Sequence, residues 1–229
     1  CNVIRLIHAD AVTISAAYVD VIGNIVENCD GNGIVTGASA AKFVIEDNIV
    51  ISCGKSGINC GGSYTIIAGN VVFNNAQAGN FDGIRLDSTS SKNLVINNYI
   101  GDDQETKTQN NGIREWTGSD YNVIMNNKID GYLGNAIVTT GANTIVKGNL
   151  GYTTENEGIA TFSGDGATTT FNIPHGLVST PSKYGVTPLT PDADATRTIT
   201  ADNTNITITY DTAPPAGADN LKFGWWAKV

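Results

Sequence analysis

The stretch VIGNIVENCDGNGIVTG, residues 21–37, contains the unit that decides the fold. Its Asn24 lies between two aliphatic pairs and nine residues before the pair Gly33-Ile34. An asparagine in the same setting recurs at spacings of 22, 24, 22, 28, 29 and 22 residues, at Asn2, Asn24, Asn48, Asn70, Asn98, Asn127 and Asn149. Self-similarity with a period of about 20 to 50 residues is typical of proteins built from stacked repeats.

Aliphatic residues accompany these asparagines at fixed distances. Three residues before the last six stand Val21, Ile45, Ile67, Val95, Ile124 and Val146. Two residues after the first six stand Ile4, Val26, Val50, Val72, Ile100 and Ile129. A small residue followed by Ile or Val comes nine residues after the asparagine, or thirteen to fourteen in the two long repeats, at Ala11-Val12, Gly33-Ile34, Gly57-Ile58, Gly83-Ile84, Gly112-Ile113, Ala136-Ile137 and Gly158-Ile159. No ten-residue stretch has a helical period and the dense leucine pattern of leucine-rich repeats is missing, so each unit predicts three short strands.

Three strands per unit predict a coil in which each turn stacks on the next at about 4.8 Å. Inward-facing Ile and Val of successive turns should pack into one continuous core, each burial contributing about 1.5 to 3 kcal/mol. An asparagine at a bend tolerates left-handed backbone geometry, and its amide can bond both the backbone and the asparagine one turn away. We therefore expect the asparagines to form a ladder along the coil.

Units such as VDVIGNIVENCDGNGIVT (19–36) and NVIMNNKIDGYLGNAIVTT (122–140) resemble the right-handed parallel β-helix family of pectate-lyase-like and copper-periplasmic repeat proteins. The resemblance covers about residues 1–160 and implies an all-β fold with about seven turns. It does not imply one activity, because this family includes lyases, hydrolases, isomerases and inert scaffolds.

The composition changes near residue 160. All six prolines lie beyond residue 170, and all four cysteines lie at or before residue 60. We therefore predict a parallel β-helix over residues 1–159 and a small antiparallel β-sandwich over residues 160–229, with strands in TTTFNI, KYGVTP, TRTITA, NITITY and LKFGWW. The segments at 160–188 and 205–226 look like a terminal module of phage and other viral tail fibres and tail spikes, which implies a homotrimer on a virion or other extracellular surface.

An outward-facing column also points to an oligomer. The residue after each asparagine should face outward, and most members of this column are apolar: Val3, Ile25, Ile49, Val71, Tyr99, Lys128 and Leu150. The alternatives are ordinary β-propensity on an exposed strand, or a different orientation at the bend. In the second module, Trp225 and Trp226 are either interface anchors or sandwich core, and Trp225 alternates with Leu221 and Phe223 as a core residue would.

The first unit starts at its bend residue, Asn2, and a stack that ended there would expose an uncapped sheet edge. We therefore expect the chain to be a fragment that lacks further N-terminal turns or a capping segment.

The two long repeats carry insertions, NNAQAGNFDGIRLDSTSS and GDDQETKTQNNGIREWTGSD, and insertions in a coil become loops on one side. In register, Arg85 stacks on Arg114, Leu86 on Glu115 and Asp87 on Trp116. Two stacked guanidiniums repel, so an anionic group should lie nearby. Either the carboxylates of Asp82, Asp87, Glu115 or Asp120 neutralise them, or the residues form a carbohydrate-binding site made of Arg85, Asp87, Arg114, Glu115 and Trp116. A third possibility buries Trp116 against a neighbouring subunit.

Catalytic interpretations stay open at this point. Glycoside hydrolysis needs two carboxyl groups about 5 to 10 Å apart, and the candidates are Asp82, Asp87, Asp102, Asp103, Glu105 and Glu115. A pectate-type lyase needs a calcium-binding carboxylate cluster beside a basic residue, to which GDDQET with Arg114 is only loosely similar. No cofactor is predicted.

The cysteines offer a disulfide more readily than a metal site. Cys29 and Cys53 each follow their asparagine by five residues and should stack one turn apart, as a disulfide or as a ladder of free thiols. Cys60 follows Cys53 by seven residues with no histidine close in sequence, so zinc is not expected. The state of Cys1 is left open.

The net charge of −9 argues against a nucleic-acid or anionic-membrane partner, and no apolar run approaches the length that spans a bilayer. The preferred hypothesis is an extracellular or virion-surface, tail-spike-like structural protein that forms a homotrimer and binds a polysaccharide on its lateral face. The alternatives are a polysaccharide lyase or glycoside hydrolase, and a filament or surface-layer subunit.

Overall fold

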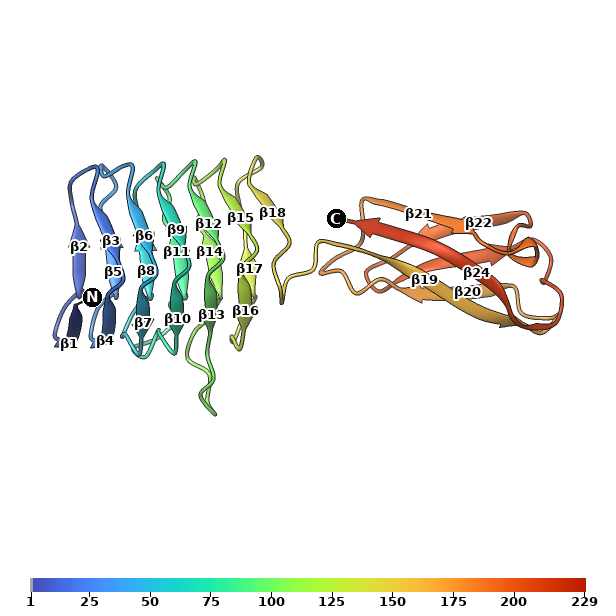
Figure 1. The fold of residues 1–229 in the computed structure, drawn as a ribbon, viewed down its shortest axis with the longest axis horizontal. Helices are drawn as coiled ribbons and strands as arrows, with labels where there is room; N and C mark the ends of the chain where they lie inside the picture. The colour runs from blue at the N-terminus through green and yellow to red at the C-terminus, as the bar shows by residue number, and fades with distance from the viewer. Residues whose placement is uncertain (1) are drawn as a thin grey trace. The chain divides into compact units, whose positions relative to one another are not determined.

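A computed structural model describes residues 2–229. The chain folds into two compact units, Cys1–Tyr152 and Thr153–Val229 (Figure 1). The division comes a few residues earlier than the expected boundary at residue 160, which falls inside strand β19 (Glu155–Gly164).

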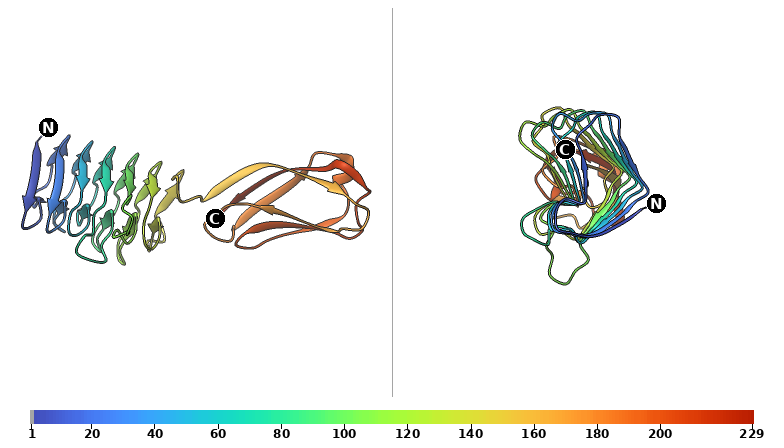
Figure 2. Two further views of the ribbon diagram at one scale, coloured as in Figure 1. Left: turned by 90° about the horizontal axis from the view of Figure 1, so that it is seen from below. Right: turned by 90° about the vertical axis from the view of Figure 1, so that its left-hand side faces the viewer.

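The first unit is a parallel β-helix of three six-stranded sheets. Sheet A contains β1 (Val3–Ile7), β4 (Ile25–Cys29), β7 (Ile49–Ile51), β10 (Val71–Phe73), β13 (Tyr99–Gly101) and β16 (Lys128–Asp130). Sheet B contains β2 (Val12–Ile14), β5 (Ile34–Thr36), β8 (Ile58–Cys60), β11 (Ile84–Leu86), β14 (Ile113–Glu115) and β17 (Ile137–Val138). Sheet C contains β3 (Asp20–Ile22), β6 (Val44–Glu46), β9 (Ile66–Ala68), β12 (Leu94–Ile96), β15 (Val123–Met125) and β18 (Ile145–Lys147). Viewed end on, successive turns overlie one another (Figure 2).

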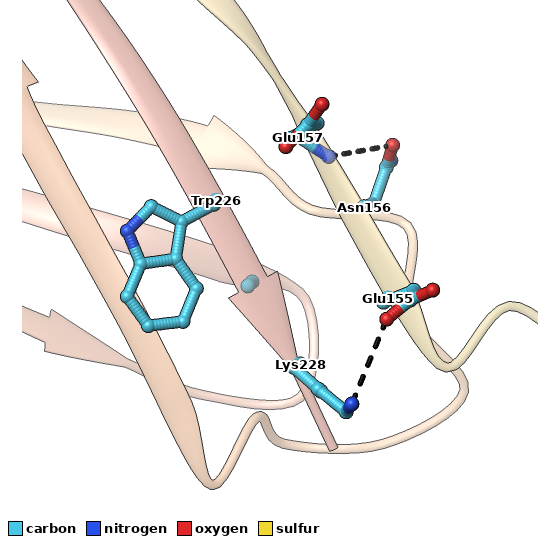
Figure 3. Close-up of a pocket in the computed structure, with 6 residues that line it drawn as sticks. Glu155, Asn156, Glu157, Trp226 and Lys228 are labelled. Atoms are coloured by element: carbon cyan, nitrogen blue, oxygen red, sulfur yellow. Dashed lines mark hydrogen bonds and ion pairs between the residues drawn. The ribbon is translucent and has the colours of Figure 1, made fainter. Parts of the chain in front are cut away.

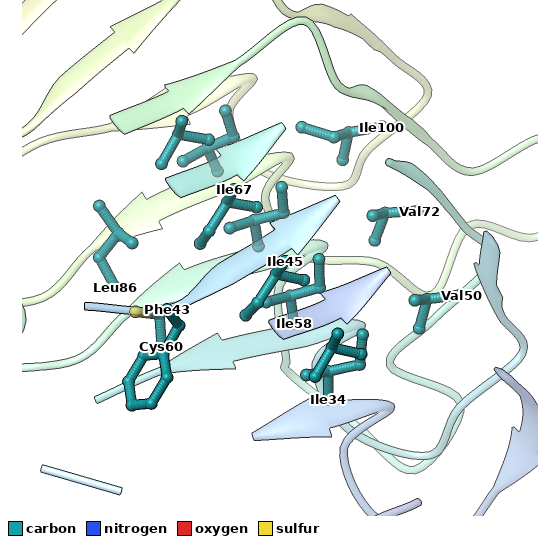
Figure 4. Close-up of a cluster of buried hydrophobic side chains, with 14 of the residues drawn as sticks. Ile34, Phe43, Ile45, Val50, Ile58, Cys60, Ile67, Val72, Leu86 and Ile100 are labelled. Carbon is teal, nitrogen blue, oxygen red and sulfur yellow. The ribbon is translucent and has the colours of Figure 1, made fainter. Parts of the chain in front are cut away.

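The predicted aliphatic columns are confirmed, one for each sheet. Sheet C aligns Val21, Ile45, Ile67, Val95, Ile124 and Val146 in register, and sheet A does the same for Ile4, Val26, Val50, Val72, Ile100 and Ile129. The third column, from sheet B, runs through Val12, Ile34, Ile58, Ile84, Ile113 and Ile137. The three columns pack together inside the coil. Figure 4 shows Val50, Val72 and Ile100 in one row and Ile45 and Ile67 in another.

The coil has six strands per sheet, one turn fewer than the repeat count predicts, because the seventh anchor pair belongs to the second unit. Gly158-Ile159 lies in β19 of the second unit, where Ile159 is 72% exposed. Among the described residues, the seventh turn consists of the last ladder asparagine, Asn149, and an isolated bridge between Lys128 and Leu150.

Close packing explains the glycine that precedes the sheet B anchors. A Cβ atom added to Gly83 would lie 2.5 Å from Cγ2 of Ile100 and 2.8 Å from the carbonyl oxygen of Gly112. Gly57 and Gly112 meet Val72 and Ile129 in the same way. Side chains from sheet A therefore fill the space that a larger residue would need.

The asparagine ladder is confirmed along the whole coil. Each of the first six ladder side chains donates from Nδ2 to Oδ1 of the next, at 3.0 Å from Asn48 to Asn70 and 2.9 Å from Asn70 to Asn98. The same Oδ1 also accepts the backbone N–H of the preceding turn's asparagine, and Nδ2 of Asn70 reaches the carbonyl of Ile45 at 2.8 Å. Asn70 is fully buried, so these bonds satisfy a polar group that water cannot reach.

The expected left-handed backbone lies one residue earlier than the ladder. The residues with positive φ at this bend are Gly23, Asp47, Gly69, Asn97, Asn126 and Gly148. Gly, Asn and Asp adopt this conformation at the least cost, whereas the ladder asparagines are selected for their amides.

Three cysteines lie inside the coil as free thiols: Cys29, Cys53 and Cys60. The hydrogen bond with the Cys29 thiol and burial both raise the pKa of Cys53. The alternative of a buried thiol ladder is therefore the one observed for Cys29 and Cys53, and Cys1 lies outside the described residues.

The second unit is the expected antiparallel β-sandwich. One sheet orders β19, β24 (Gly217–Lys228) and β21 (Lys183–Pro188), and the other orders β20 (Thr170–Pro174), β23 (Asn205–Tyr210) and β22 (Arg197–Ala201). All five predicted strands are present, and β19 is the one the sequence pattern missed. The core between the sheets includes Phe171, Ile206, Ile208, Leu221 and Phe223. Across residues 2–229, no helix is long and apolar enough to cross a membrane.

The two tryptophans of β24 have different environments. Trp225 is half-buried and packs against the sandwich core, whereas Trp226 is 47% exposed. In the coil, the outward column of sheet A exposes Val3, Ile49, Tyr99 and Leu150 and half-buries Ile25 and Val71. Both units thus present exposed or half-buried apolar side chains on their outer faces.

Replacing Asn70 with Ala should lower the free energy of unfolding by about 3 kcal/mol or more, because it leaves several buried donors and acceptors without partners. Urea denaturation followed by circular dichroism measures the change. The matched control is Asn80→Ala, since Asn80 is exposed and belongs to no ladder. Equal midpoints for the two variants would contradict the stabilising role of the ladder.

Candidate functional site

The extra residues of the long repeats lie mainly where sheet A passes to sheet B. Residues 74–83 join β10 to β11, and residues 102–112 join β13 to β14. The second loop projects away from the coil after β13 (Figure 1). Asp102 organises it by accepting backbone N–H groups of Gln104, Thr108 and Gln109 at 2.6 to 3.1 Å. Burial raises the pKa of Asp102, but these hydrogen bonds outweigh it and the pKa is lowered.

The predicted register across the insertions is confirmed. Arg85 pairs with Arg114, and Leu86 pairs with Glu115. Because the residues on either side of each arginine are buried in the coil, both guanidiniums lie on the outer face of sheet B. Asp87 and Trp116 follow their strands directly and lie at the same edge of the sheet.

Arg85, Asp87, Arg114 and Trp116 form one surface group, here called the Arg–Trp cluster. The guanidinium carbon of Arg85 lies 4.2 Å from the centre of the Trp116 ring, and that of Arg114 lies 4.1 Å from it. Nη2 of Arg85 donates to Oδ1 of Asp87 at 3.1 Å. One indole therefore holds two stacked cations, and one carboxylate pairs with the first of them.

Polar atoms without partners are concentrated in this column. Among the buried side-chain atoms that lack a hydrogen-bond partner are Oδ1 of Asn59, Nε of Arg85 and Nε of Arg114. These residues occupy one position on three consecutive strands of sheet B. Each unpaired buried group costs about 1 to 3 kcal/mol, so this column is not arranged for stability alone.

The carboxylates expected to neutralise the arginines do so only in part. Asp87 pairs with Arg85, whereas Asp120 accepts hydrogen bonds from the backbone and side chain of Asn143. Burial raises the pKa of Asp82, although the hydrogen bond from Asn111 and the charges of Arg114 and Arg85 oppose the rise. In the part of the chain that the structure describes, Arg114 forms no ion pair.

Glu115 departs from its expected place in a binding site. It is fully buried in the coil, on the opposite face of the strand from Arg114. Its carboxylate accepts from Nδ2 of Asn122 at 2.7 Å, Oγ1 of Thr144 at 2.5 Å, and the N–H groups of Thr140 and Gly141 at 3.0 and 2.8 Å. The loop after β17 supplies three of these donors and the connection after β14 supplies Asn122, so Glu115 satisfies all four and stabilises the end of sheet B.

The other carboxylates suggested for catalysis are also largely engaged. Asp82 and Asp102 are buried, and Asp103 bonds the side chain of Asn74 at 2.7 Å. Asp102, Asp103 and Glu105 lie in the loop that enters sheet B, whereas the Arg–Trp cluster lies on its outer face and far edge. Among residues 2–229, no group of three or more His, Cys, Asp or Glu side chains could hold a metal ion, so the loose similarity of GDDQET to a calcium site gains no support.

A second column of surface side chains was not anticipated. Six residues before each of five ladder asparagines stand Tyr18, Lys42, Tyr64, Lys92 and Tyr121. The same alignment that revealed the ladder could have found this column, because its spacing is constant. The strands alone did not suggest it, since these residues lie in the turns that lead to sheet C.

The second unit carries an open pocket on one sheet. It is lined by Glu155, Asn156, Glu157, Trp226, Ala227 and Lys228 (Figure 3). Lys228 Nζ lies 3.7 Å from Glu155 Oε2, and its charge is therefore already paired. His175 is buried, with Nδ1 accepting the N–H of Leu177 and Nε2 bonding the carbonyl of Asp202, so it stabilises the loop after β20.

The comparison with sequence families matches residues 9–145 to the family described as periplasmic copper-binding protein (NosD). No curated protein matches the chain. This match covers more than half of the chain and most of the coil.

Solved structures share the fold. The A-modules of the mannuronan C-5 epimerases AlgE6 and AlgE4 of Azotobacter vinelandii match with TM-scores of 0.50, identities of 16% and 18%, and coverage of 65% and 64% of this chain. The chain spans a little over half of their length, 56% and 57%. The Dettilon tailspike protein matches 91% of this chain and 56% of its own, at 14% identity and a TM-score of 0.45. At these identities the likeness concerns the fold.

The donors that copper prefers do not converge among the described residues. Copper binds thiolates, thioethers and imidazoles. The thiol of Cys60 bonds the carbonyl of Gly62, and the exposed His8 bonds Asp30. The free thiols of Cys29 and Cys53 are buried in the coil, where they donate to the carbonyl oxygens of Asn32 and Ile51, and among residues 2–229 no group of three His, Cys, Asp or Glu donors forms. The side chains present do not fit a copper site.

Replacing Glu115 with Gln should lower the free energy of unfolding by about 2 kcal/mol, because the amide NH2 would face donors that need an acceptor. The measurement is urea denaturation, with the exposed Glu105→Gln as control. A variant as stable as the control would contradict the structural role assigned to Glu115.

Proposed function

The chain belongs to the NosD family of periplasmic copper-binding proteins, and from this scaffold we propose that it is a surface-exposed structural β-helix that binds acidic polysaccharide at its Arg–Trp cluster. Its place is outside the cytoplasm, in keeping with the family's description. Attachment to a virion, as in a tail spike, is the more specific form of the same proposal and is supported by the resemblance of the C-terminal segment.

One observation carries the proposal: two guanidiniums are stacked on one indole, and a single carboxylate, that of Asp87, pairs with only one of them, Arg85. Two unit charges about 5 Å apart repel by about 1 kcal/mol in water and by several times that where the surroundings exclude water. The half-buried setting of Arg85 and Arg114 lies between these limits. An anion bound at this surface would remove the repulsion.

The chemistry suits a uronate better than a neutral sugar. Arginine forks bind carboxylates through paired N–H donors, and a preorganised guanidinium loses less entropy on binding. Trp116 acts as a positioning residue, because its ring fixes both guanidinium planes. A neutral sugar offers hydroxyl groups but no charge to balance Arg114.

The test measures binding of oligogalacturonate and of a neutral cello-oligosaccharide by isothermal titration calorimetry. We expect Arg85→Gln and Arg114→Gln each to weaken oligogalacturonate binding about tenfold or more, and Trp116→Ala to weaken it by a smaller factor. Binding of the wild type should also fall as salt rises.

The matched control is Arg5→Gln, which removes an arginine of sheet A that is paired with Glu27. It should bind as the wild type does. Unchanged binding by both cluster arginine variants, or equal affinity for the neutral oligosaccharide, would refute the proposal.

The homotrimer is proposed on separate grounds. The outward column of sheet A exposes apolar side chains over several turns, and Trp226 does so in the second unit. Exposed apolar side chains that recur on an outer face commonly lie in an interface. Burying it between copies of the chain would explain why bulky apolar residues recur at outward positions.

Sedimentation equilibrium tests the assembly. A homotrimer should have three times the 24.0 kDa mass of one chain. Ile49→Asp and Trp226→Ser should each shift the population towards monomer, because they place polar groups in the interface. Ser88→Asp, on the exposed turn after β11, is the control. A 24.0 kDa species at every concentration, or mass that rises without limit, would count against a closed trimer.

A further inference from the structure

The column Tyr18, Lys42, Tyr64, Lys92 and Tyr121, here called the Tyr–Lys ladder, alternates two residue types over five consecutive turns. Its tyrosines are exposed, at 74%, 52% and 57% in chain order. The lysines lie against them in a repeated geometry. Nζ of Lys42 donates to the hydroxyl of Tyr18 at 3.0 Å, and Nζ of Lys92 donates to that of Tyr64 at the same distance.

The backbone conformation of the ladder residues indicates that their side chains have a function beyond forming the turn. All five residues have φ between 56° and 63°, in the left-handed region. At the left-handed bend before the asparagine ladder, the chain uses only Gly, Asn and Asp, and at the bend near the end of the sheet A strands it uses Leu6, Asn28, Ser52 and Asn74. Unlike Asn and Asp, Tyr and Lys cannot offset the cost of this conformation by a hydrogen bond to the nearby backbone. Each turn of the ladder therefore contains a strained surface residue.

The ladder has a two-turn period. One turn rises about 4.8 Å, so alternate tyrosines lie about 9.6 Å apart and alternate lysines likewise. This distance is close to the length of a disaccharide unit. A tyrosine ring offers an apolar face to a sugar, and each ammonium keeps two N–H donors after bonding its tyrosine. The hydrogen bond that Lys42 donates to Tyr18 raises the pKa of Lys42, and the bond from Lys92 to Tyr64 does the same for Lys92.

We propose that the Tyr–Lys ladder binds a polysaccharide along the coil axis in which a uronate alternates with a neutral sugar. Each tyrosine takes one sugar face, and each lysine takes the carboxylate of the neighbouring uronate. The two-turn period selects the alternating polymer over a polymer with a carboxylate on every sugar, because only every second rung carries a cation. The ladder shares no residue with the Arg–Trp cluster, and the inference stands whether or not that cluster binds.

The experiment compares three probes of equal length by calorimetry: hyaluronan oligosaccharide, oligogalacturonate and cello-oligosaccharide. The probes are titrated into the Arg85→Gln/Arg114→Gln chain, so that binding at the cluster does not contribute. We expect hyaluronan to bind most tightly. Adding Tyr64→Ala or Lys92→Gln should weaken it about fivefold or more, and adding Lys128→Gln should leave it unchanged. Lys128 is the matched control because its Nζ lies 4.2 Å from the ring of Tyr99 on sheet A.

A second variant separates function from folding. Lys92→Asn places a residue that tolerates left-handed geometry at this rung, so it should raise the urea midpoint while it weakens hyaluronan binding about fivefold. If Lys92→Asn misfolds, its urea midpoint falls instead, and the hyaluronan affinity of Lys92→Gln then tests the proposal. Binding that is unchanged in Tyr64→Ala and Lys92→Gln overturns the proposal. Tighter binding of oligogalacturonate than of hyaluronan by both the wild type and the Arg85→Gln/Arg114→Gln chain also overturns it. The absence of any hyaluronan binding does the same. Loss of oligogalacturonate binding in the cluster variant alone concerns only the Arg–Trp cluster.

Discussion

Each turn of the coil is held to the next by the amide of one asparagine, and the register that this bond imposes governs the rest of the first unit. The amide oxygen accepts two N–H groups from the preceding turn, and the amide nitrogen donates to the next asparagine and to a buried carbonyl. A slip of one residue would break these bonds and turn every aliphatic side chain to the wrong face. The core and the surface columns therefore share one alignment.

Because the register is fixed, surface chemistry repeats along the coil. Arg85 has to lie beside Arg114, and tyrosines and lysines have to alternate at the turn before sheet C. Both arrangements have an energetic cost in the isolated chain: like charges and unpaired donors in the Arg–Trp cluster, and left-handed Tyr and Lys in the ladder. Such costs are common at binding surfaces, where a ligand compensates for them.

The interior and exterior of one strand can differ sharply in role. In β14, Arg114 faces outward to Trp116, while its neighbour Glu115 faces inward to four donors. The family's copper description does not extend to the described side chains, since Cys29, Cys53 and Cys60 are buried among hydrophobic residues and no group of three His, Cys, Asp or Glu donors forms among residues 2–229. The scaffold is shared, and the chemistry depends on which residues occupy the outward columns.

The sequence by itself determined the stacked coil, its three aliphatic columns, the asparagine ladder and the stacking of Arg85 on Arg114, because a fixed period converts directly into spatial neighbours. It also determined the sandwich from alternating apolar residues between proline and glycine turns. Only the tertiary structure decided where the repeat ends, since Gly158-Ile159 fits the pattern yet pairs with β24. It also decided that Glu115 is buried and that positive φ precedes the ladder. Those properties depend on which donors a loop turns inward and on the backbone path at a bend, and neither is encoded in the period.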